Sequence, residues 1–275
     1  MFENFTRSFQ LVKESFEVLK KDKEIMLFPV ISAIVTVLLL ISFIVPIFFY
    51  NTGIDNFGYV LLFIYYILSY FIVIFFNTGL ITCAHIRLNG KDPTFMDGFN
   101  NAKKHIGKIF VWALISATIG LILRIIADRS SWVGKIVVAI IGMAWSLITF
   151  FVIPVMVFEN ISVFESIKRS GYLFKKTWGE NVIGQFSMGF IFLILGIAGI
   201  IPLILAFMTG SFVLIIPVFA LVVIYWIFLG IVSASLEGIF VAALYNYASI
   251  GKIPSVYSPE VITTAFQPKN LQGTI

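Results

Sequence analysis

The sequence is short of charge, cysteine and histidine, and each shortage excludes a class of protein. Charged residues make up 12% of the 275 positions, about half the share that soluble domains carry. No long polar segment remains from which a soluble domain could be built, so the composition is that of an integral membrane protein. Cys83 is the single cysteine, which excludes an intramolecular disulfide and a cysteine-cluster metal site.

Sequence signatures of catalysis are missing as well. His85 and His105 are the only histidines and fall in different segments, and there is no HExxH motif, glycine-rich phosphate loop or nucleophile elbow. Asp92 and Asp97 are close enough in sequence for a metal pair, but Asp92 precedes a proline in a turn and Asp97 opens a predicted helix. We therefore expect a non-enzymatic protein with no catalytic residue, metal or cofactor, and keep an intramembrane enzyme as an alternative.

Apolar runs are what the sequence has in abundance, since 60% of its residues are hydrophobic and 30 are phenylalanine. A bilayer core about 30 Å thick needs about 20 apolar residues as a helix. Six runs qualify, at residues 25–50, 59–86, 109–127, 132–158, 182–207 and 212–247. Continuous apolarity favours helices over a β-barrel, whose strands alternate in hydrophobicity. The sequence thus predicts an all-α, polytopic membrane protein with six transmembrane helices.

The last run is longer than one ordinary span. As a helix it would extend about 54 Å at 1.5 Å per residue. Two interpretations fit this length: a tilted helix that protrudes on one side of the membrane, or a re-entrant segment broken at Pro217 or Gly230. We favour the tilted helix.

Basic residues predict the orientation of the chain. Of the 19 lysines and arginines, 16 lie in the N-terminal segment, the second and fourth connections and the C-terminal tail. The opposite side holds only Arg124, Arg129 and Lys135. Because positive residues stay on the cytoplasmic side, both termini are predicted to be cytoplasmic. The net charge of +5 is explained by this orientation, and we expect no nucleic-acid partner.

A related segment precedes the first, third and fifth apolar runs. In each, apolar residues recur four, three and four positions apart, on one face of a helix. They are Phe5, Phe9, Val12 and Phe16; Phe95, Phe99, Ala102 and Ile106; and Ile167, Gly171, Phe174 and Trp178. Basic residues accompany the second and third faces: Lys103, Lys104, Lys168, Arg169, Lys175 and Lys176. Such helices are predicted to lie in the membrane interface, with these basic residues as candidates for contact with lipid headgroups.

These segments predict a threefold repeat, in which an interfacial helix precedes a transmembrane hairpin. Shorter echoes recur in the same order: FPVISA at 28–33 resembles WALISA at 112–117, and NGKDP at 89–93 resembles IGKIP at 250–254. The chain is predicted to be a single membrane domain over residues 1–275. Its repeat units are about 1–88, 89–158 and 159–247, followed by a tail over 248–275.

Two phrases carry a resemblance to a known family. They are DKEIMLFPVIS (22–32) and SIKRSGYLFKKTWGENVIGQF (166–186). With the hairpin plan, they resemble an uncharacterised prokaryotic family of six-span integral membrane proteins, a domain-of-unknown-function family, over most of the chain. More loosely, the plan is similar to the membrane domain of bacterial glycerophosphodiester phosphodiesterases, whose soluble catalytic domain this chain lacks. The resemblance implies a six-span fold in the prokaryotic cytoplasmic membrane and implies no activity.

Polar residues inside the spans are candidates for a functional site, because burying them in lipid is costly. Glu237 is the strongest candidate, with Ser233 and Ser235 beside it, and Asn77 and Thr78 interrupt the second run. Two interpretations of Glu237 stay open. Its carboxyl group either hydrogen-bonds a neighbouring helix or is protonated, or it forms a coupling-ion or substrate site.

Three further features have structural interpretations. Small residues at four-residue spacing predict a ridge for close helix packing, at Gly230, Ala234, Gly238 and Ala242. Arg124 is a possible partner of Glu237, but its position near the outer end of a span favours snorkelling to the outer surface. Glu159 and Asn160 end the fourth run and are predicted to cap the helix that follows.

The sequence alone therefore predicts a non-enzymatic integral membrane protein whose interfacial helices engage membrane lipids, anionic ones included, or organise a membrane complex. A protein partner or a homo-oligomer is compatible with this function. The alternative is a transporter or lipid-handling channel with a polar site around Glu237.

Overall fold

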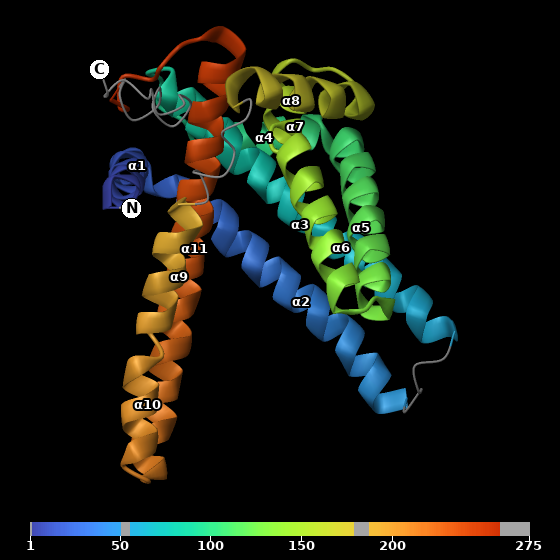
Figure 1. Cartoon of the computed structure of the whole chain (residues 1–275), viewed down its shortest axis with the longest axis vertical. Helices are drawn as coiled ribbons and strands as arrows, with labels where there is room; N and C mark the ends of the chain where they lie inside the picture. Colours follow the sequence, from blue (N-terminus) through green and yellow to red (C-terminus); the bar gives the residue numbers. More distant parts are fainter. Residues whose placement is uncertain (1, 51–55, 179–186, 259–275) are drawn as a thin grey trace, which may run out of the picture.

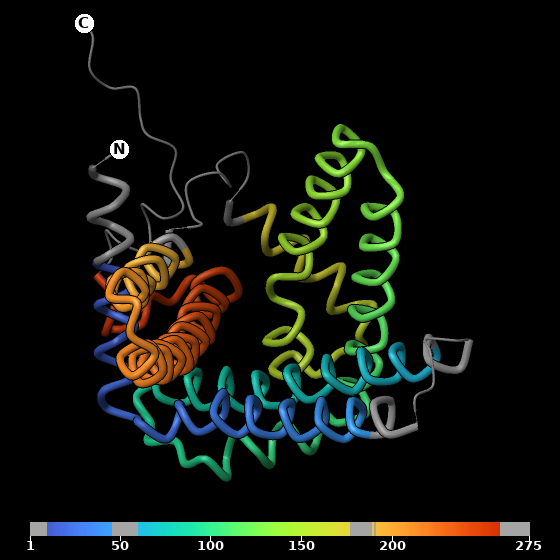
Figure 2. The backbone as a smooth tube through the Cα atoms, turned by 90° about the horizontal axis from the view of Figure 1, so that it is seen from below, coloured from blue at the N-terminus to red at the C-terminus, as the bar shows by residue number. Residues whose placement is uncertain are grey.

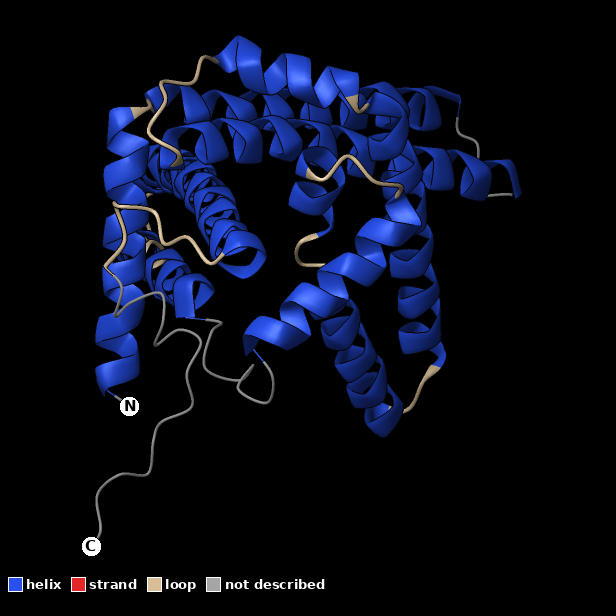
Figure 3. Cartoon of the chain, turned by 90° about the horizontal axis from the view of Figure 1, so that it is seen from above, coloured by secondary structure: helices blue, strands red, loops and turns tan. Residues whose placement is uncertain are grey.

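The computed structural model describes residues 2–50, 56–178 and 187–258. Every regular element in these ranges is a helix (Figures 1 and 3). The elements in chain order are α1 (Phe2–Lys21), the 3-10 turn η1 (Lys23–Met26), α2 (Leu27–Tyr50), α3 (Asn56–Leu88), α4 (Phe95–Lys104), α5 (Ile106–Arg129), α6 (Trp132–Ile148), α7 (Val152–Phe158), α8 (Val163–Trp178), α9 (Ser187–Ala198), α10 (Ile201–Met208) and α11 (Phe212–Ile250). The predicted all-α class is confirmed for the described residues.

Six stretches are long and apolar enough to cross a membrane, as predicted. They are Lys23–Val45, Val60–Leu88, Ile106–Arg129, Trp132–Phe158, Ile191–Met208 and Phe212–Ile250. The predicted start of the fifth run, at residue 182, lies outside the described residues. The other runs correspond in order to the predicted ones.

The last run is one continuous helix, so the re-entrant interpretation is wrong. α11 has 39 residues and passes through both Pro217 and Gly230 without a break. At 1.5 Å per residue it extends about 58 Å. A helix of this length reaches well beyond a hydrocarbon layer about 30 Å thick.

The fourth and fifth runs, in contrast, are each divided into two helices. The fourth is broken between α6 and α7, at residues 149–151, and the fifth between α9 and α10, at residues 199–200. Pro202 occupies the first turn of α10, where its missing N–H group is tolerated and its fixed φ favours the start of a helix. Hydropathy does not report such breaks, because the residues on both sides of them are equally apolar.

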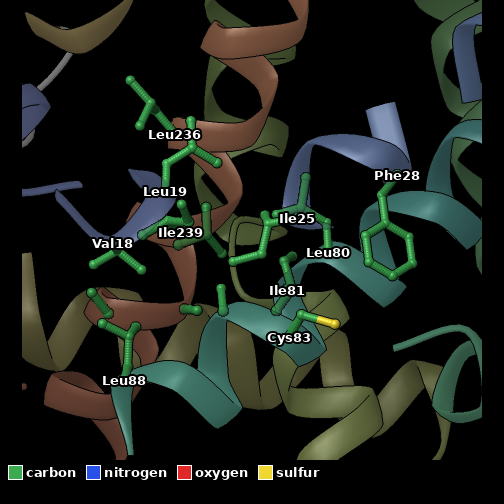
Figure 4. Close-up of a cluster of buried hydrophobic side chains, with 14 of the residues drawn as sticks. Val18, Leu19, Ile25, Phe28, Leu80, Ile81, Cys83, Leu88, Leu236 and Ile239 are labelled. Carbon is green, nitrogen blue, oxygen red and sulfur yellow. The ribbon is translucent and has the colours of Figure 1, made fainter. Parts of the chain in front are cut away.

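Burial divides the molecule into two regions. No residue from 60 to 73 of α3 is buried, whereas most from Ile74 onward are. Before Ser235 of α11 only Val222 is buried, whereas most residues from 235 to 248 are. We call the well-packed part the compact end; it comprises α1, η1, α4, α7, α8, residues 74–88 of α3 and residues 235–250 of α11. Figure 4 shows its central cluster, where Leu80 and Ile81 of α3 meet Ile239 of α11.

Two arms leave the compact end and diverge (Figures 1 and 2). The α2–α6 arm comprises α2, residues 56–73 of α3, α5 and α6. The α9–α11 arm comprises α9, α10 and residues 212–234 of α11. Large apolar side chains are exposed along both arms, such as Leu38, Ile140, Val213 and Ile224. Exposed apolar surface of this extent fits a lipid environment.

Short-range hydrogen bonds cap the N-termini of α4 and α8 in the compact end. α4 begins with a capping box, in which the Asp97 N–H donates to the Thr94 hydroxyl and the Thr94 N–H donates to the Asp97 carboxylate. These bonds lower the pKa of Asp97. α8 has the same device in Ser162 and Glu165, and the bonds from Ser162 lower the pKa of Glu165. Both caps follow a residue with positive φ, Gly90 or Asn160.

The prediction that Glu159 and Asn160 cap α8 is therefore wrong. Ser162 supplies the cap, as described above. Asn160 instead adopts a left-handed backbone with φ of 54° and accepts a hydrogen bond from Lys108 at 2.7 Å. Asparagine tolerates this conformation better than most residues, which suits it to the end of α7.

Candidate functional site

Glu237 is the ionisable residue among the polar candidates, and it lies on α11 beside buried residues. Its side chain is exposed although Ser235, Leu236, Gly238 and Ile239 around it are buried. No hydrogen bond or ion pair joins its carboxyl group to another described residue. It lies where α11 passes from the α9–α11 arm into the compact end. The carboxyl group is thus free to meet a ligand, a lipid headgroup or another chain.

Two of the other polar candidates, Thr78 and Ser235, form hydrogen bonds within their own helices. The buried Thr78 hydroxyl donates to the carbonyl oxygen of Ile74 in its own helix, at 2.8 Å. The buried Ser235 hydroxyl donates in the same way to Ile231, at 2.8 Å. Such bonds satisfy a hydroxyl inside a helix and need no ligand. Thr78 and Ser235 are therefore explained by local structure.

Asn77 reaches the helix that carries Glu237. A Cβ atom on Gly238 would lie 3.5 Å from the Asn77 Oδ1 atom and would collide with Leu80. The absence of a side chain at Gly238 is what permits α3 and α11 to approach here. Asn77 and Ser233 are half-buried. The structure thus brings Asn77 close to the α11 segment that carries Glu237.

Only part of the predicted small-residue ridge is used for packing within the chain. Gly238 and Ala242 are buried against neighbouring helices, whereas Ala234 is exposed and Gly230 faces open space. Arg124 is exposed on α5 and forms none of the ion pairs found among the described residues. The alternative in which Arg124 pairs with Glu237 is therefore not seen in the structure.

The predicted headgroup residues are exposed lysines, with one exception. Lys103 and Lys104 on α4 and Lys168, Lys175 and Lys176 on α8 are all exposed. Arg169 is the exception, because its Nε atom donates to Glu159 at 3.1 and 3.2 Å. The Tyr245 hydroxyl donates to the same carboxylate at 3.3 Å. The Arg169 side chain therefore also ties α8 to the end of α7 and to α11.

α8 also exposes aromatic side chains beside its lysines. Phe164 and Tyr172 are 66% and 58% exposed, and Lys168 lies between them on the same helix face. The Arg169 guanidinium lies 5.7 Å from the centre of the Tyr172 ring. The side chain of Trp178, which the sequence also placed on the apolar face, lies outside the described side chains.

In α1, α4 and α8 the buried face is offset from the predicted one. Along one line of each helix the buried positions are Leu11, Ser15 and Val18 in α1; Gly98 and Ala102 in α4, with His105 at its C-cap; and Ser166, Ser170 and Leu173 in α8, while Leu19 and Val163 beside these lines are buried as well. Each set has spacings of four and three, as expected for one helical face. Of the predicted positions, Ala102 is buried, whereas Phe16 and Ile106 are exposed. Phe5, Phe9 and Trp178 lie outside the described side chains.

Ser170 bridges the break in the fourth run, a role that the hydropathy pattern gave no reason to expect. Its hydroxyl donates to the carbonyl oxygen of Ile148 at 2.6 Å and accepts from the N–H of Phe151 at 2.9 Å. Both partners are backbone groups at the division between α6 and α7, where the regular hydrogen-bond pattern of a helix is interrupted. The burial of Ser170 is visible only in the structure, so hydrophobic periodicity could not find this bridge.

α4 and α1 carry comparable links. Asn101 of α4 donates to the Thr82 hydroxyl of α3 at 3.0 Å. Ser15 of α1 hydrogen-bonds the hydroxyl of Tyr257, in the segment after α11, at 2.8 Å. Tyr257 is buried, and this burial raises the pKa of its hydroxyl. A polar side chain from each of α1, α4 and α8 thus links that helix to a neighbouring element.

Two aromatic side chains of α11 form hydrogen bonds with α9 beside the break in the fifth run. The Tyr225 hydroxyl donates to the carbonyl oxygen of Leu195 at 2.8 Å, and the Trp226 indole N–H donates to that of Gly196 at 3.1 Å. A side chain at Gly199 would meet the Tyr225 ring at 2.5 Å. These aromatic residues therefore use both their rings and their polar atoms to hold α9 against α11.

Ion pairs and hydrogen bonds of charged residues link the end of α3 and the η1 turn to the start of α4. Arg87, at the end of α3, forms hydrogen-bonded ion pairs with Asp22 and with Asp92. Glu24 accepts a hydrogen bond from the backbone N–H of Phe95 at 2.8 Å. Asp22 and Glu24 belong to the phrase DKEIMLFPVIS, so its acidic residues have a structural role. No group of three or more potential metal-binding side chains occurs among the described residues.

Six membrane-crossing stretches and their exposed apolar surface define a multi-pass membrane protein. The chain belongs to the family of unknown function DUF6159, whose model matches residues 56–255. The matched range runs from α3 to the segment after α11 and includes the phrase at 166–186, whereas the phrase at 22–32 lies outside it. No curated protein and no solved structure matches the chain.

Proposed function

We propose that the protein is a non-enzymatic membrane protein whose compact end lies at the cytoplasmic surface of a prokaryotic membrane and binds anionic lipid headgroups. α1, α4 and α8 are interfacial helices in this proposal, and each precedes a transmembrane hairpin. Both termini are cytoplasmic, because the basic residues concentrate on that side. The bound lipids, together with a protein partner or a second copy of the chain, would organise a membrane complex.

The surface of α8 is the observation that carries this proposal. Lys168, Lys175 and Lys176 are exposed beside the exposed rings of Phe164 and Tyr172. Lysines beside aromatic side chains suit the boundary between headgroups and acyl chains, where rings insert and ammonium groups meet phosphate. In this proposal the apolar arms fill the hydrocarbon layer, so the compact end with α8 lies at the boundary with the headgroups.

The test is lipid selectivity after loss of the α8 lysines. Replacing Lys168, Lys175 and Lys176 with Gln should reduce retention of phosphatidylglycerol relative to phosphatidylcholine in native mass spectrometry. Each lysine near an anionic surface contributes about 1 kcal/mol. The matched control replaces Arg124, Arg129 and Lys135 with Gln, which removes the same charge from the opposite side. Equal loss in both triple variants, or no loss in the α8 variant, would refute lipid binding by α8.

A transporter or lipid-handling channel is the second candidate, and the free carboxyl group of Glu237 favours it. Exposed carboxyl groups on membrane helices are costly unless a ligand or partner meets them. A carbodiimide that partitions into lipid should modify Glu237 in membranes, and peptide mass spectrometry should find no such product in the Glu237→Gln variant. An unmodified Glu237 in the natural chain would count against a lipid-accessible site there.

A further inference from the structure

The two arms separate at a place on α3 and α11 that carries polar side chains. Toward the compact end the two helices touch, since a Cβ atom on Gly238 would collide with Leu80 and lie 3.5 Å from the Asn77 Oδ1 atom. Toward the arms they part: Val73, one turn before Asn77, is 51% exposed, and Ala234 of α11 is exposed as well. The polar residues at this place are called the branch site: Asn77, Ser233 and Glu237.

Asn77 lies on the side of α3 that faces between α11 and α7. Ile74, Asn77 and Leu80 follow one another at three-residue spacing, so Asn77 lies between the other two around the helix. Ile74 is buried in a cluster with Val152 of α7, and Leu80 is buried in a cluster with Ile239 of α11. The half-buried amide of Asn77 therefore lies at the edge of the contact between α3 and α11, on the side of α7.

Glu237 lies on the same side of that contact. Glu237, Leu244 and Ala248 are seven and four residues apart, so they share one face of α11. Leu244 and Ala248 are buried in a cluster with Val155 of α7 and Leu173 of α8. Glu237 precedes Leu244 by about 10 Å along the helix axis, where the same face is exposed. The carboxyl group and the amide of α3 thus face the same side of the molecule, where the arms begin.

The branch site offers hydrogen-bond acceptors. The carboxylate of Glu237 only accepts, and the Ser233 hydroxyl and the amide oxygen of Asn77 accept as well. Ser233 is half-buried one turn before Glu237. The Ser235 hydroxyl bonds the carbonyl group four residues earlier, whereas no hydrogen bond of the Ser233 hydroxyl is found among the described residues. None of the ion pairs in the described part of the chain includes Glu237, so a cation that meets it comes from elsewhere.

The surface next to the branch site is apolar and consists mainly of small residues. Ala234, Gly230 and Ile227 precede Glu237 by three, seven and ten residues, along the same face of α11. Ala234 is exposed, Gly230 has open space at its Cβ position, and Ile227 is 56% exposed. An occupant that covers this surface and meets the acceptors has a cationic end with hydrogen-bond donors and an apolar chain.

We propose that the branch site binds the ethanolamine headgroup of a phospholipid. Its primary ammonium group has three N–H donors for the carboxylate of Glu237, the hydroxyl of Ser233 and the amide oxygen of Asn77. Its acyl chains lie along α11, against the small residues that precede Glu237. A choline headgroup carries the same charge but has no N–H group to donate. The proposal rests on the membrane placement given under the proposed function, and it is independent of lipid binding by the α8 lysines.

The first test locates the lipid on the natural chain. Phosphatidylethanolamine with a diazirine in an acyl chain is added in small amount to nanodiscs, and crosslinked peptides are identified by mass spectrometry. We expect crosslinks in residues 70–77 and 227–237. They should be about three- to tenfold weaker when the other lipid is phosphatidylethanolamine than when it is phosphatidylcholine, the scale of a partly exposed charge-assisted contact. Crosslinks to α6 should not depend on the headgroup.

Two results of this experiment would overturn the proposal. The first is equal competition by the two lipids at residues 70–77 and 227–237. The second is an absence of crosslinks there with either lipid, which would assign the branch site to a second copy of the chain or to a protein partner.

Variants test the role of the carboxyl group. Glu237→Gln keeps the length of the side chain and should abolish the headgroup preference, and Asn77→Ala should reduce it. The matched control is Asp128→Asn, which removes an exposed carboxyl group from the far end of α5. A preference that persists in Glu237→Gln, or an equal loss in the control, would overturn the proposal.

The variant with Lys168, Lys175 and Lys176 replaced by Gln separates this proposal from lipid binding by α8. It should keep the ethanolamine preference even where it loses phosphatidylglycerol. Loss of both preferences in this variant would show that they have one origin and would overturn a separate branch site.

Discussion

The compact end and the two arms use the same kinds of residue in opposite ways. In the compact end, apolar residues are buried by one another, as Ile81 and Ile239 are, and polar side chains link one element to the next. In the arms, many large apolar side chains are exposed, such as Leu38 and Val213, and the helices of the two arms diverge. The arms therefore depend on a surrounding apolar solvent, whereas the compact end is a protein core in its own right.

The largest loss of stability is expected in the compact end, where a side chain added at a helix–helix contact would meet backbone atoms. A Cβ atom at Gly98 of α4 would lie 2.5 Å from the carbonyl oxygen of Gly79 and 2.6 Å from the Phe28 ring. Gly98→Ala should therefore destabilise the protein by about 1–3 kcal/mol or more. The measurement is the thermal unfolding temperature in detergent. Gly107→Ala is the matched control, since nothing lies within 4 Å of its Cβ position, and equal shifts in the two variants would contradict the packing described.

Loss of the Ser170 hydroxyl should have the next largest effect. Ser170→Ala leaves the Ile148 carbonyl group and the Phe151 N–H group without their partner, which costs about 1–3 kcal/mol when such groups are buried. Thermal unfolding and hydrogen exchange at residues 148–152 both report it. The control is Ser42→Ala in α2, where an exposed hydroxyl bonds only its own helix. A Ser170 variant as stable as the control would show that the break needs no bridge.

The α9–α11 arm, which contains the fifth run, should lose less stability when a hydrogen bond at its own helix break is removed. Tyr225→Phe removes the hydrogen bond to Leu195 but keeps the ring against Gly199. We expect a loss of about 0.5–1.5 kcal/mol, with faster amide exchange confined to α9 and α10. Faster exchange throughout the compact end in this variant would show that the two regions do not unfold independently.

The smallest expected effect is the loss of the capping interaction of α4 at acid pH. The pKa of Asp97 is lowered by its bonds from Thr94, so its stabilising contribution is present above the ordinary aspartate range near pH 3.9. That contribution is lost as the pH falls through the lowered pKa. After correction for intrinsic exchange rates, protection of the first-turn amides of α4 should fall below about pH 4 in the natural chain. Asp97→Asn should reduce this acid dependence, and an unchanged acid profile in that variant would exclude the carboxylate as its source.

The sequence was informative where the solvent decides the structure and less so where specific contacts decide it. Apolar runs predicted six spans because lipid-facing helices need only length and hydrophobicity. The breaks after Ile148 and Ala198 were missed, because backbone groups at these breaks are hydrogen-bonded by Ser170, Tyr225 and Trp226 from other segments of the chain. The face of α8 was offset for a similar reason. Its buried positions include Ser166 and Ser170, which hydrophobic periodicity counts as polar.

The candidate site was anticipated in part. Glu237 stood out as an ionisable residue in a long apolar run, and its exposure on α11 keeps it a candidate. The lysines of α8 were found from charge alone. The packing of the His85 ring against Phe158 and Tyr245 was not, because His85 is unexceptional in sequence and these contacts arise only when α3, α7 and α11 pack together. The roles of Arg169 and Glu159 likewise appear only in their mutual ion pair.

The central claim is that the arms occupy the hydrocarbon layer and that the compact end begins at its surface. Spin labels placed singly at Ile216, Ile224, Ala234 and Glu237 of α11, in a Cys83→Ser background, test it by their accessibility to oxygen and to a water-soluble nickel complex. We predict oxygen-dominated relaxation at Ile216 and Ile224 and nickel-dominated relaxation at Glu237, with the crossover near Ala234. Oxygen-dominated relaxation at all four positions would place Glu237 within the hydrocarbon layer and contradict the account.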